Sequence, residues 1–124
     1  MGLTLDAGAL VAADKGSRAF WALLKAAHQD GLPVTVEAVV LAQAWRSDNV
    51  AVARLLRFSI CESLTPDRAR RVGVLLGQTR TADIVDGTVA LGAVDRGDAI
   101  VTSDRNDIER LVGSLRGKNR IIDI

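Results

Sequence analysis

Four aspartates, arranged as two pairs of equal spacing, are the side chains of this sequence best suited to chemistry. Asp83 and Asp86 are three residues apart, and so are Asp104 and Asp107. Each pair stands at the start of a run with the apolar spacing of a helix. Carboxylates that gather in one place repel one another, raise one another's pKa and are stabilised by a cation. The chemistry to test for is therefore that of a metal ion held by oxygen ligands.

The lengths of two neighbouring elements predict that the two pairs meet. A helix from Asp86 to Arg96 descends about 15 Å at 1.5 Å per residue, and Gly97 is placed to end it. A strand from Ala99 to Asp104 climbs back about 16 Å at 3.3 Å per residue. Asp86 and Asp104 are then expected at the carboxyl edge of one sheet, which is where open α/β sheets bind ligands.

Asp6, which follows the short apolar run 3–5, is expected at the same edge. Each of these aspartates, taken alone, is explained by helix capping, because Asp accepts backbone amide hydrogens at helix starts. Capping does not require Asp6, Asp86 and Asp104, from three separate elements, to converge. Three converging carboxylates suit Mg²⁺ or Mn²⁺, and such a site favours hydrolysis of a phosphate ester, with nucleic acid as the leading substrate.

The rest of the chain alternates between short β-rich runs and helical patterns, which predicts an α/β fold with a mostly parallel five-stranded sheet covered on both faces. The length of 124 residues predicts a single domain, residues 1–124. The expected strands are 3–5, 34–36, 58–61, 99–102 and 120–124. The expected helices are 9–13, 17–29, 37–45, 49–57, 65–76, 86–96 and 104–115, with 77–81 as a polar loop.

The composition of the chain limits which kinds of binding partner are expected. The net charge is +1, which neither requires nor excludes nucleic acid. Of the 16 basic residues, 13 are Arg. The Arg guanidinium can bind a phosphate through two parallel hydrogen bonds, which would suit RNA, although a bias in codon usage explains the excess equally well. Only four residues are aromatic, too few for a platform that stacks several bases; they are Phe20, Trp21, Trp45 and Phe58.

Single residues exclude further classes. Cys61 is the only cysteine, which rules out an internal disulfide or a cysteine metal cluster, and we expect it in the core. His28 is the only histidine and is expected to be solvated near a helix end, which leaves no catalytic triad. Because no apolar stretch reaches the length of a membrane span and the amino end carries no basic leader, we expect a cytoplasmic protein.

Four segments together resemble the PIN domain, specifically the VapC-type toxins of bacterial toxin–antitoxin pairs. The resemblance spans the whole chain, and its most specific part is the spacing of 18 residues between Asp86 and Asp104. The segments are Leu3-Thr4-Leu5-Asp6, Val39-Val40-Leu41-Ala42-Gln43-Ala44-Trp45-Arg46, Asp83-Ile84-Val85-Asp86 and Ile100-Val101-Thr102-Ser103-Asp104.

The resemblance implies a three-layer α/β/α sandwich and a ribonuclease that depends on Mg²⁺ or Mn²⁺ and uses metal-activated water. Asp6, Asp86 and Asp104 would match the metal-binding acids of the family, with Asp107 as a further ligand. Family members commonly cut structured RNA such as tRNA, form homodimers and are silenced by a cognate antitoxin. Candidate phosphate contacts are Arg18, Arg46, Arg80 and Arg105.

The chain departs from the family pattern at two places. Gln43 stands where the family usually has Glu; its carbonyl oxygen can still face the site, but one negative charge is lost. Glu37 is not expected to replace it, because six residues along a helix turn the side chain by about 240°. Ala7 and Gly8 follow Asp6 where a hydroxyl residue is common, so a hydrogen bond that supports the site is expected to be missing there.

Two other functions stay open at this point. A PIN-like module that has lost catalysis at Gln43 would bind RNA or a partner without cutting. A phosphoryl-transfer receiver domain also gathers acids at a sheet edge, but it needs a Lys beside them. An antitoxin helix is expected on the apolar segment 9–13, with Trp21 and Trp45 as wall residues, unless these side chains simply belong to the core.

Overall fold

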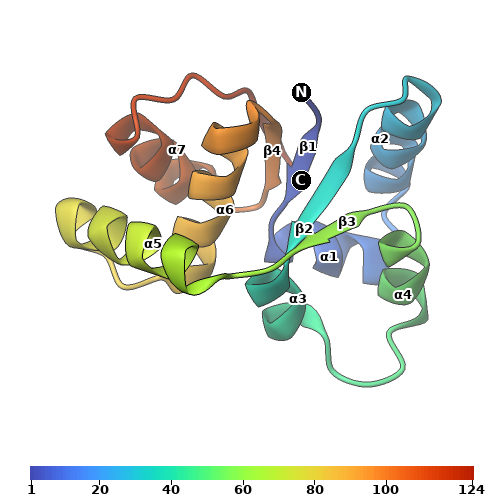
Figure 1. Cartoon of the computed structure of the whole chain (residues 1–124). Coiled ribbons are helices and arrows are strands. Elements are labelled where there is room, and N and C mark those ends of the chain that lie inside the picture. The colour runs from blue at the N-terminus through green and yellow to red at the C-terminus, as the bar shows by residue number, and fades with distance from the viewer.

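The computed structural model describes residues 1–124 as one parallel five-stranded sheet between two layers of helices (Figure 1). The sheet has the order β3-β2-β1-β4-β5, and all four pairings are parallel. The expected α/β class and three-layer sandwich are confirmed. The strands are β1 (Leu3–Leu5), β2 (Val34–Glu37), β3 (Ile60–Glu62), β4 (Ala99–Thr102) and β5 (Ile121–Asp123).

Seven helices connect the strands. In Figure 1, α5, α6 and α7 lie on one side of the sheet and α1, α2 and α4 on the other, with α3 next to the end of β2. None of them combines the length and the apolar character that a membrane span requires. They are α1 (Ala7–Asp14), α2 (Arg18–Gln29), α3 (Ala38–Ala44), α4 (Val50–Leu56), α5 (Pro66–Thr79), α6 (Ile84–Arg96) and α7 (Arg105–Ser114).

Local signals set most helix ends. The hydroxyl oxygen of Ser17 accepts the amide of Phe20 at the start of α2, and Thr65 does the same for Arg68 at the start of α5. Gly97 ends α6 with a φ of 71°, a left-handed conformation that glycine adopts without strain. These positions agree with the sequence-based expectation because capping involves residues that are close together in the chain.

Helix α5 runs further than expected. The segment 77–79, expected as the beginning of a loop, is the last turn of the helix, and the chain leaves it at Arg80 with a φ of 55°. Leu75, Leu76 and Thr79 are buried. Their packing outweighs the cost of an exposed glycine inside a helix, which is about 1 kcal/mol.

The expectation that Cys61 lies in the core is wrong. Cys61 is exposed because its strand, β3, forms an edge of the sheet. Phe58 and Ile60 beside it are also exposed, at 52% and 53%. An apolar run of four residues does not reveal whether its strand is central or at the edge, since strand order depends on contacts between distant segments.

Helix α6 is the central helix of its layer. Every residue from Asp86 to Ala93 is buried, and the helix contacts α5, α7 and strands β1, β2 and β4. Its packing requires two glycines: a Cβ at Gly87 would lie 2.9 Å from Leu76 Cδ2, and one at Gly92 would lie 2.7 Å from Glu37 Oε2. The close approach fixes where α6 begins relative to the sheet, and with it the place of Asp86.

Candidate metal centre

The acidic residues lie where the connections of the sheet change direction. From β1 the chain moves to β2 on one side, while β4 pairs with β1 on the other. Asp6 directly follows β1, and Asp104 follows β4 after one residue, Ser103, so the two aspartates flank this point at the carboxyl edge. Asp86 comes from the first turn of α6. Ligands of open α/β sheets bind at such switch points.

Asp86, Asp104 and Asp107 form the centre of the acidic cluster. One carboxylate oxygen from each can be chosen so that all three lie within 4.8 Å of one another. Helix capping does not explain them. Asp83, not Asp86, caps α6 by accepting the amide of Asp86 at 3.0 Å, and Asp104 occupies the N-cap position of α7 without a side-chain capping bond.

Asp6 adjoins this group in a different way. It does cap its helix, because Oδ1 accepts the amide of Ala9 at 2.9 Å. Oδ2 accepts the Thr102 hydroxyl in a short hydrogen bond and the Ser103 amide at 3.3 Å. Asp6 is 3% exposed and its charge acts on both Asp86 and Asp104. Asp6 is therefore both a cap and a fixed negative charge behind the exposed acids.

Thr102 holds two of the acids in position. Its hydroxyl donates to Asp6 and accepts the backbone amide of Asp104 at 2.8 Å. The hydrogen bond that seemed to be missing after Asp6 is thus supplied from β4. A side chain at Gly8 could not supply it, because a Cβ there would collide with the Ser103 side chain.

Crowding changes the protonation of the cluster. Burial, together with the charges of Asp83, Asp104 and Asp6, raises the pKa of Asp86 to about 7. Partial loss of hydration, together with the neighbouring Asp107, also raises the pKa of Asp104. Asp86 is only 8% exposed, its side chain shares a hydrogen bond with Asp104, and no basic residue forms an ion pair with it. A bound cation would reduce the repulsion among these carboxylates.

The donor set fits a hard divalent ion. The three clustered groups offer carboxylate oxygens only, which Mg²⁺ and Mn²⁺ prefer over the nitrogen and sulfur ligands of zinc sites. Beside them lies a hollow of about 70 Å³, which leaves room for water. Its lining residues are Thr81, Asp83, Asp86, Asp107, Arg110 and Leu111.

Gln43 and Glu37, the two positions considered for the acid usual in the family, lie in different surroundings. Gln43 is exposed on α3, a helix that contacts α1 and α6, and its side chain makes no hydrogen bond with the acids. Glu37 is fully buried and paired with Arg68 at 2.7 Å and with Arg96 at 3.6 Å. The expectation that Glu37 does not replace the missing acid agrees with these ion pairs.

None of the arginines named from the sequence lines the hollow beside the acids. Arg18 is exposed at the start of α2, and Arg80 is exposed at the end of α5. Arg46 donates to the neighbouring Trp45 carbonyl at 2.8 Å. Arg105 is occupied by Asp123, Glu109 and the Ile121 carbonyl, so it ties α7 to β5.

The basic residue beside the acids is one that sequence reasoning missed. Arg110 lines the same hollow as Asp86 and Asp107. Its sequence signal is the spacing of three residues from Asp107, which places both side chains on one face of α7. None of the lysines lines this hollow, and the receiver-domain alternative therefore lacks the Lys it needs.

Comparisons with known proteins give one kind of match. No family model matches the sequence, and no curated protein matches it either. Among solved structures, the chain is similar to one from "VapBC2 from Rickettsia felis bound to a DNA fragment from their promoter", with a TM-score of 0.75 and 14% identity over 100% of this chain and 99% of that one. It is also similar to PAE2754 from Pyrobaculum aerophilum, with a TM-score of 0.60 and 18% identity over 99% of this chain and 89% of that one.

Identities this low carry information about the backbone only. The match nevertheless covers the whole chain, from β1 to β5. It agrees with the resemblance found in the four sequence segments and with the strand order around the acidic cluster. The chain therefore shares its fold with these two structures, which agrees with the PIN-like fold that the sequence segments led us to expect.

Proposed function

We propose that this protein is a Mg²⁺- or Mn²⁺-dependent endoribonuclease that acts as the toxin of a VapBC-type toxin–antitoxin system. The observation that carries the proposal is the group formed by Asp86, Asp104 and Asp107 at the switch point of a VapC-like fold. In this proposal the protein works in the cytoplasm as a homodimer, its substrate is RNA such as tRNA, and its regulator is a cognate antitoxin.

The residues have distinct roles in this proposal. Asp86, Asp104 and Asp107 would hold the ion, with Asp6 adding negative charge from behind and Gln43 offering a neutral oxygen. A bound divalent ion supplies charge stabilisation for the phosphodiester and makes water a better nucleophile at neutral pH. Thr102 keeps Asp6 and the backbone before α7 in fixed positions, so that the ligands need no rearrangement when the ion binds.

The first experiment measures RNA cleavage by Asp104→Asn. Because Asp104 is exposed and makes no capping bond, its replacement should leave the fold unchanged. We expect Mn²⁺-dependent cleavage to fall by at least about 100-fold, the order of a lost electrostatic contribution to a transition state. Asp14→Asn, at the exposed end of α1, is the matched control and should cleave like the wild type. Equal rates for all three proteins would refute the assignment.

A second function is kept because of Gln43. With glutamine in place of the acid usual in the family, the cluster loses one charge, and the protein could bind RNA or a partner without cutting it. Calorimetric titration with Mn²⁺ separates the two functions. Binding that disappears in Asp104→Asn favours the nuclease, whereas RNA binding without any affinity for the ion favours the binding module.

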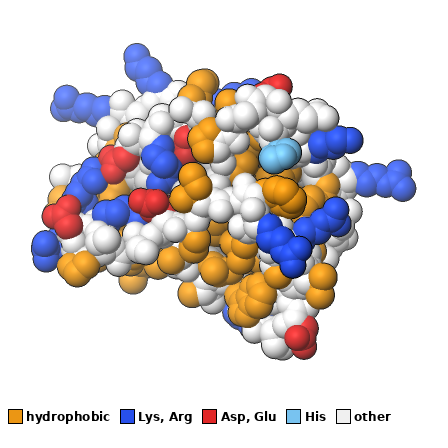
Figure 2. Space-filling view, turned by 45° about the vertical axis from the view of Figure 1, so that its right-hand side comes forward, with side chains coloured by type: hydrophobic (Ala, Val, Ile, Leu, Met, Phe, Trp, Pro, Cys, Tyr) orange, Lys and Arg blue, Asp and Glu red, His pale blue; other side chains and the backbone are white.

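We propose a different antitoxin surface from the one expected from the sequence. In the segment 9–13, Ala9, Leu10 and Ala13 are at most 1% exposed and belong to the core, which leaves Val11, at 44%, as the exposed large apolar side chain of this segment. Trp45 is partly exposed on another part of the chain. Trp21, in contrast, lines a groove of about 420 Å³ between α2 and α4. Figure 2 shows hydrophobic side chains with basic ones beside them on this side of the molecule.

Charge indicates which kind of helix fits the groove. Its walls include Trp21 and Phe58, and its rim carries Lys25 and Arg54. Arg54 lies 5.8 Å above the Trp21 ring, and neither basic residue belongs to an ion pair. Unpaired cations beside an apolar wall favour an amphipathic helix with acidic residues, and we propose this chemistry for the antitoxin.

Charge reversal tests the groove. The partner is the protein encoded next to this chain, and its affinity is measured by calorimetry. We expect Arg54→Glu to weaken binding by at least tenfold, since like charges at an interface are unfavourable. Arg70→Glu makes the same change on α5, on the opposite side of the sheet, and should bind like the wild type. An equal effect of both variants would show that only net charge matters.

A further inference from the structure

The acidic cluster attracts a cation but repels the substrate that the proposed function requires. RNA brings a phosphate to every nucleotide, and five aspartates lie at or near the site: Asp6, Asp83, Asp86, Asp104 and Asp107. One divalent ion does not neutralise five carboxylates and a phosphodiester. A nuclease built on this site needs a further cation close to the ion.

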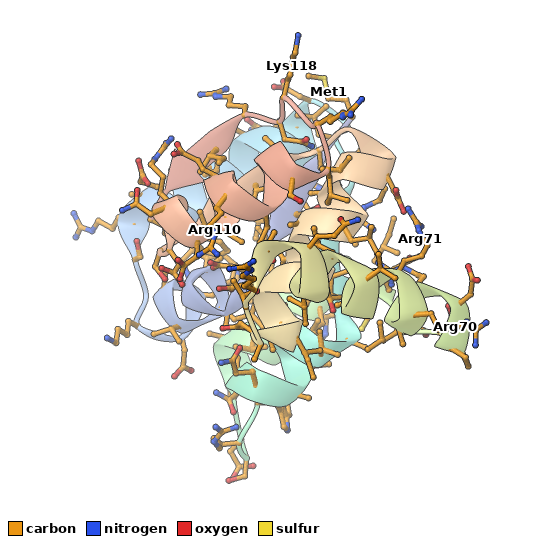
Figure 3. All side chains as sticks on the ribbon, turned by 90° about the vertical axis from the view of Figure 1, so that its left-hand side faces the viewer. Met1, Arg70, Arg71, Arg110 and Lys118 are labelled. Atoms are coloured by element: carbon orange, nitrogen blue, oxygen red, sulfur yellow. The ribbon has the colours of Figure 1, made fainter.

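Arg110 meets the requirement of position. It lines the hollow of about 70 Å³ together with Asp83, Asp86 and Asp107, and it is the only basic residue among the lining side chains. Its residue is exposed, so a ligand can reach the guanidinium from solvent. Figure 3 shows Arg110 on α7 near the end of α5, whereas Arg70 and Arg71 lie on the other half of α5.

Arg110 also has donors to spare. No ion pair of the structure includes it, although acids line the same hollow. Its one hydrogen bond is a short contact from Nη2 to the Thr79 carbonyl oxygen. A guanidinium has five N–H donors in a planar fork. The contact with Thr79 therefore orients the group and leaves further donors for a phosphate.

The other arginines provide the contrast. Arg105 is the arginine nearest in sequence to Asp104, but its guanidinium donates hydrogen bonds to Asp123, Glu109 and the Ile121 carbonyl. Arg71 is held by Asp95 through two bonds of 2.7 and 2.8 Å. Among the basic side chains of α5 and α7, Arg110 is thus the one that is oriented, unpaired and next to the acids.

We propose that Arg110 binds the RNA phosphate at or next to the scissile bond and positions it against the ion held by Asp86, Asp104 and Asp107. This inference rests on the proposed ribonuclease function and names a substrate contact for it. A forked contact to a phosphate gives a defined orientation in addition to charge neutralisation. The contact also lets α7 contribute both a metal ligand, Asp107, and a phosphate ligand one turn later.

The test compares the wild type with Arg110→Ala and Arg110→Lys, with Arg70→Ala as the control on exposed α5. Binding of a single-stranded RNA is measured by fluorescence anisotropy over a range of salt, with Ca²⁺ in place of Mn²⁺ to slow cleavage. We expect Arg110→Ala to weaken binding about tenfold and to lower the salt slope by about 0.7, the value for one phosphate contact on a single strand. Arg110→Lys should restore the slope, and Arg70→Ala should change neither quantity.

Cleavage with Mn²⁺ and thermal unfolding complete the design. We expect KM to rise in Arg110→Ala while the affinity for Mn²⁺, measured without RNA, does not fall. The inference is overturned if the salt slope of Arg110→Ala is unchanged. It is also overturned if RNA binding and melting temperature fall together in Arg110→Ala and Arg110→Lys restores neither, because Arg110 would then only stabilise the fold through its contact with Thr79. If the wild type binds RNA through Arg110 but cuts none, the nuclease proposal fails separately.

Discussion

Replacing Asp86 with Asn is expected to abolish metal-dependent RNA cleavage and, at the same time, to stabilise the metal-free protein above pH 7. The reason is the crowding of the cluster. Burial and the neighbouring charges of Asp83, Asp104 and Asp6 raise the pKa of Asp86 to about 7, against about 3.9 in an unfolded chain. Between these values the folded state holds a proton that the unfolded state releases.

The direction of the pH dependence follows from that difference. Where the folded state binds more protons, the free energy of unfolding falls as the pH rises. The contribution of Asp86 is therefore absent below about pH 4, becomes increasingly unfavourable as the pH rises from about 4 to about 7, and reaches its full size of up to about 4 kcal/mol above about pH 7. A neutral Asn avoids this cost at every pH. A bound divalent ion removes it in the wild type by pairing with the carboxylate.

Thermal unfolding at pH 5 and pH 8, with chelator and with Mn²⁺, measures the effect. We expect the wild type with chelator to be less stable than Asp86→Asn at pH 8, and the gap to narrow at pH 5. Mn²⁺ should raise the melting temperature of the wild type and leave that of the variant unchanged. Asp14→Asn, at the exposed end of α1, is the contrast, because Asp14 is not among the charges that act on Asp86 and its replacement should change stability little at either pH. If Asp86→Asn with chelator were less stable than the wild type at pH 8, the ionised Asp86 carboxylate would be stabilising, and the prediction would be wrong.

The second large effect is expected at Glu37, far from solvent. Its carboxylate is fully buried and receives two bonds from Arg68, at 2.7 and 3.0 Å, with Arg96 at 3.6 Å. Arg96 in turn donates to Asp98 at 3.0 Å and to Thr4 at 3.0 Å. Burial raises the pKa of Glu37, while Arg68 and Arg96 oppose the shift. The group joins β2 to α5 and α6.

Removing the charge of Glu37 leaves the Arg68 guanidinium without its carboxylate partner, whereas Arg96 keeps its ion pair with Asp98. We expect Glu37→Gln to lower the free energy of unfolding by about 3–5 kcal/mol, the usual cost of breaking a buried ion pair. Urea unfolding at pH 7 measures the loss. Glu62→Gln on β3, which forms no ion pair, is the control and should change stability by less than about 0.5 kcal/mol. A loss of less than about 1 kcal/mol in Glu37→Gln would contradict the structural role of the pair.

Gly92 gives an independent view of the same group. A Cβ there would lie 2.7 Å from Glu37 Oε2 and 2.9 Å from Arg96 Nη2. Gly92→Ala should therefore destabilise the protein, even though Ala favours helices by about 1 kcal/mol over Gly. At Gly73 on α5 a Cβ would meet nothing within 4 Å, and Gly73→Ala is expected to be stabilising. Opposite signs for one substitution in two helices would confirm that the ion pair restrains α6.

The sequence predicted much of the backbone because the relevant interactions are local. The caps at Ser17, Thr65 and Asp83 involve residues three positions apart, and Gly97 ends α6 through its own φ. The meeting of Asp86 and Asp104 also followed from local quantities, since a helix and the strand after it have known rises per residue. These features need no knowledge of which strands are neighbours.

Tertiary structure decided what each side chain does. Cys61 is exposed because β3 is at the edge of the sheet, Asp6 is held by Thr102 from a strand about a hundred residues away, and Arg105 is drawn to Asp123 on β5. Arg110 could take the place beside the acids only because α7 packs against α5 and α6. The residue types, caps and element lengths of this chain are set by its sequence. Hydrogen-bond partners across strands depend on pairings between distant segments, and those pairings decide which acid is a helix cap, which acids cluster together and which arginine lies beside them without an ion pair.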